Sequence, residues 1–173
     1  MLRRLAIVAL AVVGAGCSAP SAERASLDRV EVERGVDGPV LVVDQRLQFS
    51  RTMLRALTQG IPLRLDYRLH GCGASSRWEH RAALEMSFAS VRRVYELRDG
   101  SGEVRRFARR SALLAALDRV RIPLDDVPAA CAGQVSVALD PDALPAPLRL
   151  PAWLESDEWR MQSESRSWLA PAR

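Results

Sequence analysis

Three cysteines and two histidines are the side chains of this 173-residue chain best suited to chemistry. Cys72 and Cys131 form an even pair once Cys17 is set aside, and an even pair in an oxidising compartment favours a disulfide. A zinc site is one alternative, because His70, Cys72 and His80 place three potential ligands within eleven residues. Cys131 would be the fourth ligand, but this spacing matches no standard zinc module. Two unpaired thiols are the other alternative. The sequence therefore favours a disulfide between Cys72 and Cys131 and predicts no metal site.

Acid–base or nucleophilic catalysis would have to use His70 or His80, since the chain has only two histidines. His80 lies in an alternating segment, which explains it as a core or strand-edge side chain. The carboxylates of Glu79 and Glu85 share a strand face but lie about 20 Å apart, beyond the separation that glycosidases use. The chain contains no nucleophile elbow, phosphate loop or zinc-protease motif. We therefore expect no catalytic residues and no cofactor.

The first seventeen residues indicate export and lipid attachment. Arg3 and Arg4 precede a nine-residue apolar run over residues 5–13, and small residues lead from there to Cys17. This order resembles a bacterial lipoprotein signal, in which residues 1–16 are removed and Cys17 is acylated. The alternatives are ordinary secretion and a retained anchor. Ser18 stands where an aspartate would hold the product at the inner membrane, so we expect lipid anchoring on the periplasmic side of the outer membrane. A soluble periplasmic protein is the alternative location.

The composition fits one exported domain. Removing residues 1–16 from the 173 leaves 157, enough for one domain with a hydrophobic core. The net charge falls from +4 to +2 without Arg3 and Arg4, so we expect no nucleic-acid partner. The charge is uneven, because residues 77–121 hold eleven Arg and six acidic residues, whereas residues 122–173 hold four Arg and eight acidic residues. Two solvated faces are one explanation, and a basic strip facing anionic lipid or an acidic partner is the other.

Period-two alternation predicts most of the fold. The clearest strand is residues 63–70, in which large apolar residues alternate with charged residues and His70. Further strands are expected over residues 27–33, 40–49, 78–88, 91–98, 103–107, 135–139 and 158–168. One continuous core is expected to contain Leu41, Val43, Leu47, Leu63, Leu65, Tyr67, Leu84, Met86, Val135 and Val137. The alternating positions Arg64, Asp66, Arg68 and Glu85 are expected to face water.

Two segments have helical rather than strand periodicity. Ser50 is a suitable N-cap for a helix over residues 51–59. Ser111 is the corresponding residue for a helix over residues 111–120, where Leu113, Leu114 and Leu117 form an apolar stripe. Residues 141–151 carry too many prolines for a long helix, so we expect a crossover there with one turn at most. The chain thus predicts an α+β fold, mainly an antiparallel sheet or sandwich with two short helices packed at its edges.

Tryptophans near the C-terminus form the most distinctive aromatic set of the chain: Trp153, Trp159 and Trp168. Packing in the core beneath the proline-rich crossover is one explanation for them. A candidate interaction surface, on which these rings would be exposed to a partner, is the other.

Three segments resemble a known family. They are residues 60–69, residues 94–107 with the Leu/Ala helix that follows, and residues 144–159, of which the last is the most specific. Together they resemble the proteobacterial family called domain of unknown function 4390, over about residues 27–168. The resemblance implies an exported, single-domain envelope protein with no assigned activity, cofactor or catalytic residues.

These observations predict a lipoprotein-type signal peptide (residues 1–16), a flexible tether (residues 17–26) and a single β-rich domain (residues 27–170). We expect a non-catalytic interaction or structural module of the cell envelope, held to the membrane through lipid on Cys17. Its expected partner is another envelope protein, to which it offers a sheet edge or the tryptophan region. The alternative is a small-ligand binder or an enzyme with a site near His70, Cys72 and His80.

Overall fold

The computed structural model describes residues 24–72, 78–128, 130–154 and 156–170. The predicted signal peptide, Cys17 and most of the predicted tether therefore lie outside the described residues. The first strand begins at Ala25, two residues before the expected domain boundary, because Ala25 is already buried in the core. No helix in the described part of the chain has the length and apolarity needed to span a membrane.

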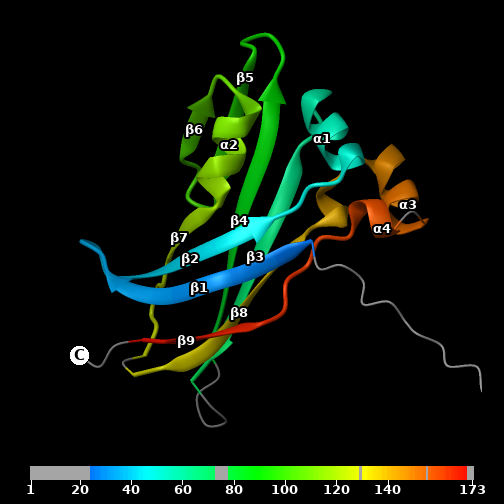
Figure 1. Cartoon of the computed structure of the whole chain (residues 1–173). Helices are drawn as coiled ribbons and strands as arrows, with labels where there is room; N and C mark the ends of the chain where they lie inside the picture. The colour runs from blue at the N-terminus through cyan, green and yellow to red at the C-terminus, as the bar shows by residue number, and fades with distance from the viewer. Residues whose placement is uncertain (1–23, 73–77, 129, 155, 171–173) are drawn as a thin grey trace, which may run out of the picture.

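The described residues form nine strands in two antiparallel sheets, consistent with the expected α+β class (Figure 1). The smaller sheet has the order β1-β2-β7, and the larger has the order β6-β5-β4-β3-β8-β9. The strands are β1 (Ala25–Arg34), β2 (Pro39–Leu47), β3 (Leu63–Gly71), β4 (Trp78–Ala89), β5 (Val94–Asp99), β6 (Val104–Phe107), β7 (Arg119–Pro123), β8 (Ala132–Leu139) and β9 (Arg166–Leu169).

Strand β3 lies in the interior of the larger sheet, paired with β4 on one side and β8 on the other. Its apolar positions, from Leu63 through Tyr67 to Leu69, are all buried, and Arg64, Arg68 and His70 between them are exposed. Because successive side chains of a strand point to opposite faces, this alternation fixes which face of the sheet is covered. The predicted period of this strand is confirmed.

Among the described residues, one hydrophobic cluster joins the inward faces of both sheets and includes residues from Ala25 to Ala170. Nine of the ten predicted core residues are buried in it, and Leu47 is half-buried against it. Of the residues expected to face water, Arg64 and Arg68 are exposed, whereas Asp66 and Glu85 are partly covered. The described residues thus share one continuous hydrophobic core.

A buried glutamine connects the two layers and the helix between them. Gln45 of β2 donates through its Nε2 to the hydroxyl of Tyr67 on β3, at 2.7 Å, and to the carbonyl of Leu117, at 2.8 Å. Leu117 ends α2 (Arg110–Leu117), the helix that runs from β6 of one sheet to β7 of the other. Burial raises the pKa of Tyr67, so its hydroxyl stays protonated. Gln45, the polar exception in an apolar strand face, therefore fixes the position of α2 against both sheets.

The first of the two predicted helices agrees with the structure, and the second differs from it. Helix α1 (Arg51–Thr58) has the expected cap, since the hydroxyl of Ser50 accepts from the backbone N–H of Met53 at 3.0 Å. Helix α2 begins at Arg110, so Ser111 lies inside it and is not its cap. The helix also ends three residues early, because Val120 belongs to β7 and pairs with Val43 of β2. Pairing with a neighbouring strand outweighs the helical periodicity of this segment.

The C-terminal segment differs most from the prediction. Residues 141–151 form a 3₁₀ turn (Pro141–Ala143) and most of helix α3 (Ala146–Leu154), where a crossover with one turn was expected. Proline fits the first turn of a helix, where the missing N–H has no partner to lose, so Pro147 is compatible with the start of α3. The predicted strand over residues 158–168 is wrong as one element: helix α4 (Ser156–Trp159) occupies its start, and only β9 remains at its end.

Strand β3 supplies a direct test of the two faces. Leu65→Asp would place a carboxylate in the core, and we expect it to cost more than about 4 kcal/mol of the free energy of unfolding. The matched control is Arg68→Asp, which puts the same residue on the exposed face opposite Arg81 and should change stability by less than about 1 kcal/mol. Denaturant unfolding of both variants is the measurement. Similar stability of the two variants would contradict the assignment of faces.

Candidate functional site

The predicted disulfide is present at the end of β3. Cys72 follows β3, Cys131 precedes β8, and their sulfurs are bonded at 2.01 Å with Cα atoms 4.8 Å apart. Within the described residues no group of three His, Cys, Asp or Glu side chains is placed to hold a metal ion. The two sulfurs are bonded to each other, so neither is available as a thiolate ligand or nucleophile. The cysteines therefore have a structural role here, as the pairing pattern predicted.

The two histidines lie on opposite faces of the larger sheet. His80 pairs with Leu69 on the core side and stacks on Trp78 with ring centroids 5.7 Å apart. His70 pairs with Glu79 on the exposed side, because adjacent residues of β3 point to opposite faces. The alternative of an active or ligand-binding site shared by His70, Cys72 and His80 is thus not supported by their positions. A shallow hollow of about 360 Å³ borders His70, but neither His80 nor Cys72 lines it.

Two glycines permit close approaches at this end of the sheet. Trp78, Gly71, Gly133 and Trp168 occupy one row across β4, β3, β8 and β9. The two indole rings meet edge to face with centroids 5.6 Å apart. A Cβ on Gly133 would lie 2.5 and 2.7 Å from ring carbons of Trp168, and closer still to the carbonyl oxygen of His70. A Cβ on Gly71 would instead meet backbone atoms of β8, so Gly133 is required by the packing of Trp168 and Gly71 by the close approach of β8.

Two of the three tryptophans proposed as an interaction surface are buried. Trp159 is 6% exposed and Trp168 is 4% exposed, so both rings are part of the core. The buried indole N–H of Trp168 has no hydrogen-bond partner within the described residues. The side chain of Trp153 lies outside what the structure describes. The core explanation therefore applies to Trp159 and Trp168, and a surface for partners must be sought elsewhere.

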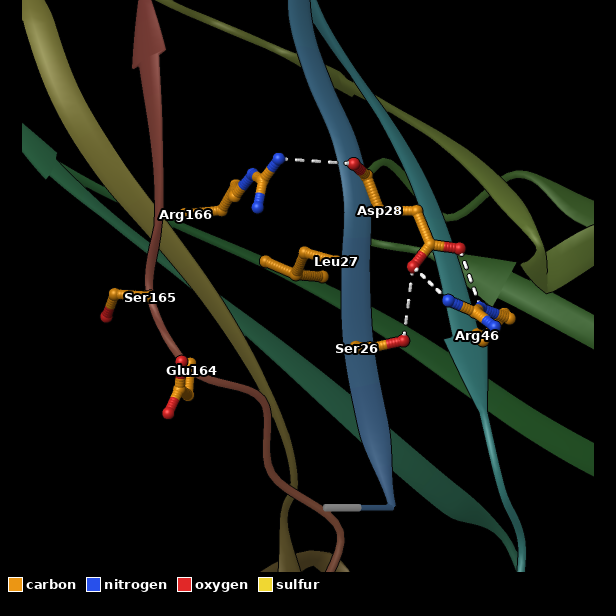
Figure 2. Close-up of a pocket in the computed structure, with 7 residues that line it drawn as sticks. All are labelled: Ser26, Leu27, Asp28, Arg46, Glu164, Ser165 and Arg166. Atoms are coloured by element: carbon orange, nitrogen blue, oxygen red, sulfur yellow. Dashed lines mark hydrogen bonds and ion pairs between the residues drawn. The ribbon is translucent and has the colours of Figure 1, made fainter.

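The two long sides of the sandwich are closed in different ways. Helix α2 packs against β5, β6 and β7 and closes one side. On the other side the outer strands β1 and β9 face each other, and among the strands that the structure describes each has a partner along one edge only. Between them lies an open groove of about 460 Å³, lined by Ser26, Leu27, Asp28, Arg46, Glu164, Ser165 and Arg166 (Figure 2). This groove is the best-defined candidate site of the described chain.

Irregularities in both strands shape the groove. In β1 the register with β2 shifts between Leu27 and Arg29, which leaves Asp28 as the extra residue of a β-bulge. On the opposite wall, the backbone of Ser163 still pairs with Val137 of β8, and Arg166 resumes the pairing three residues later. The residues between them, Glu164 and Ser165, turn away from β8 and line the groove. The bulge in β1 and the turn of Glu164 and Ser165 away from β8 thus hold the two edges apart.

Charged side chains of both signs line the groove, and two of the four, Asp28 and Arg46, form an ion pair. Asp28 accepts two hydrogen bonds from the guanidinium of Arg46, at 2.8 and 2.9 Å, and a longer one from the hydroxyl of Ser26. The hydrogen bond from Arg46 holds the pKa of Asp28 below its ordinary value. Arg166 reaches across the groove and donates to the backbone carbonyl of Asp28 at 3.4 Å (Figure 2). The groove therefore offers backbone groups and neutral polar side chains rather than a field of one sign.

The groove residues could not have been selected from the sequence. Asp28 and Arg46 belong to separate strands, and Arg166 lies 138 residues beyond Asp28. No motif links them, because what brings them together is the facing of two sheet edges. The one available signal was the expectation that a sheet edge would be offered to a partner, and that expectation did not identify which edge.

A family model described as domain of unknown function (DUF4390) matches residues 22–169. The match covers all nine strands of the described chain, so it concerns the whole sandwich and not one segment. It agrees with the resemblance drawn from the sequence. No curated protein and no solved structure matches this chain.

The aromatic row gives a test of packing at the disulfide end. Gly133→Ala would force a methyl group against Trp168, and we expect a loss of about 3 kcal/mol in the free energy of unfolding. The control is Gly100→Ala, because a Cβ there would meet only one backbone atom, at 4.0 Å. Thermal unfolding of the oxidised proteins is the measurement. A Gly133→Ala protein as stable as the control would mean that Trp168 does not press on the backbone.

Proposed function

Since the chain belongs to the family described as domain of unknown function (DUF4390), we propose a role for it as a cell-envelope lipoprotein that binds another envelope protein. The lipid is carried by Cys17, and the domain stands on the periplasmic side of the membrane, with the outer membrane favoured. The Arg-led apolar run that ends in small residues before Cys17 supports this proposal. The Cys72–Cys131 disulfide also supports it, because disulfides persist in oxidising compartments such as the periplasm.

The observation that carries the binding role is the groove between β1 and β9. Within the described residues each strand has one edge without a strand partner, and such an edge presents backbone donors and acceptors to an added strand. The ligand that fits is an extended polypeptide segment, since the walls offer backbone groups and charges of both signs. The segment lies along β1 and takes the place of Arg166 at the carbonyl of Asp28.

Anchoring is tested by removing the acylated residue. Cys17→Ala should abolish incorporation of labelled fatty acid and move the protein from the membrane fraction to the soluble periplasmic fraction, because a diacylated terminus is a stable anchor. Metabolic labelling with cell fractionation measures both effects. Ser18→Ala is the matched control and should behave like the wild type. A wild-type protein that takes up no label would refute the lipoprotein assignment.

Strand addition is tested by site-specific photo-crosslinking in intact cells. A photoreactive residue at Ser165, on the groove wall, should give a discrete adduct with another envelope protein. The same residue at Ser111, exposed on α2 on the opposite side of the sandwich, should give none. In a paired strand each residue lies opposite one residue of the neighbouring strand. Probes at Ser26 and Arg29 should therefore crosslink to two positions in the partner whose separation follows the separation of the two probes. Equal adducts from Ser165 and Ser111 would contradict strand addition. Crosslinked positions in the partner whose separation does not follow that of the probes would also contradict it.

A further inference from the structure

Charge is unevenly distributed along the hairpin formed by β5 and β6. At its turn the carboxylate of Asp99 accepts from the turn backbone, and the acidic and basic residues around the turn balance. At the opposite end of the hairpin Tyr95 pairs with Phe107, and two pairs of arginines begin two residues beyond it. One end of the hairpin is therefore basic and the other is close to neutral.

The register brings two arginine pairs to the same end of the sheet. Arg92 and Arg93 immediately precede β5, and Arg109 and Arg110 follow β6 at the start of α2. Since Tyr95 lies opposite Phe107, these two pairs extend from the same end of the antiparallel hairpin. Figure 1 shows the turn between β4 and β5 and the start of α2 together toward the top of the view.

These arginines are poorly neutralised. Glu96 is the acidic partner of Arg92, at 3.7 Å, but it also accepts an ion pair from Arg106 at 3.1 Å. Arg93, Arg109 and Arg110 form no ion pair within the described residues. Helix α2 has no acidic residue in its first turn and no side-chain cap, so its positive end adds to this charge instead of being compensated. Such an arrangement costs stability in the isolated protein and is offset when an anionic surface is bound.

An apolar tip stands beside this charge. Val91, in the turn between β4 and β5, is 97% exposed and is followed directly by Arg92 and Arg93. A large apolar side chain flanked by basic residues is typical of segments that enter the headgroup region of a membrane, where the side chain leaves water and the guanidinium groups meet phosphates. An acidic protein partner would need only the arginines for binding, so it would not explain why Val91 is exposed.

We propose that this basic end, composed of Val91, Arg92, Arg93, Arg109 and Arg110, docks on an anionic phospholipid surface. The arginines contact lipid phosphates, and the side chain of Val91 inserts at the headgroup boundary. This contact is separate from the acyl chains on Cys17, because it needs only folded residues of the domain. It would orient the domain on the membrane and leave the groove between β1 and β9 on another side of the molecule.

Vesicle binding of the unlipidated chain from Ser18 onward, which retains the whole described core, tests this proposal. The unlipidated protein should co-sediment with vesicles that contain equal amounts of phosphatidylglycerol and phosphatidylcholine at near-physiological ionic strength. It should not co-sediment with vesicles of phosphatidylcholine alone. Arg93→Gln/Arg109→Gln should weaken partitioning about twenty-five-fold, since each arginine near an anionic surface contributes roughly a fivefold factor. Raising the salt concentration should weaken the partitioning of the wild type until it approaches that of the variant.

The matched control is Arg68→Gln/Arg81→Gln, which removes the same charge from the exposed face of the larger sheet. Both arginines are exposed and form no ion pair in the described part of the chain. This control should lose less than about threefold in partitioning, because its charges lie away from the basic end. Equal losses in the two double variants, or wild-type binding that does not depend on phosphatidylglycerol, would overturn the proposal. Absence of binding at near-physiological ionic strength would overturn it in favour of an acidic protein partner.

Discussion

The rest of the structure depends on the pairing of β3 along both of its edges. Its apolar side chains all point to one face, so β4 and β8, which pair with it directly, must present their apolar positions to the same side. A slip of one residue would move Arg64 and Arg68 into the core, and the cost of burying these charges makes the register unique. The same strand carries Tyr67, which binds Gln45 of the smaller sheet, and it ends next to Cys72. Layer packing and the disulfide therefore both follow from its register.

The two sides of the sandwich differ in what lies between the sheets. Helix α2 runs from the larger sheet to the smaller and is held by Gln45 through the carbonyl of Leu117. On the opposite side the described residues place no helix between β1 and β9, and the walls are held apart by the bulge at Asp28 and by Glu164 and Ser165, which turn away from β8. An edge that remains open in a folded domain is a place for recognition by an added strand, and the proposed function rests on this asymmetry.

Residues that suggested chemistry in the sequence have packing roles in the fold. The sulfurs of Cys72 and Cys131 are bonded to each other, and the ring of His80 stacks on Trp78. Gly133 admits Trp168 over the backbone, where its ring meets that of Trp78 edge to face, so Trp168 has a packing role. The surface features left over are of another kind: an open pair of strand edges and a basic end with an exposed valine. Both suit binding to extended surfaces.

The sequence by itself determined the periods and inward faces of most strands and the first helix with its Ser50 cap, and it favoured the cysteine pairing. Each depends on local alternation, on a cap within three residues or on counting, which are properties of the chain in one dimension. The tertiary structure alone decided that Val120 joins a sheet although its neighbours are helical, and that the last predicted strand divides into α4 and β9. It also decided that Asp28 meets Arg166 and that Tyr95 pairs with Phe107, which places two arginine pairs at the same end of a hairpin. These outcomes depend on which edges face each other across a sandwich, and contacts between residues far apart in the chain leave no periodic signal along it.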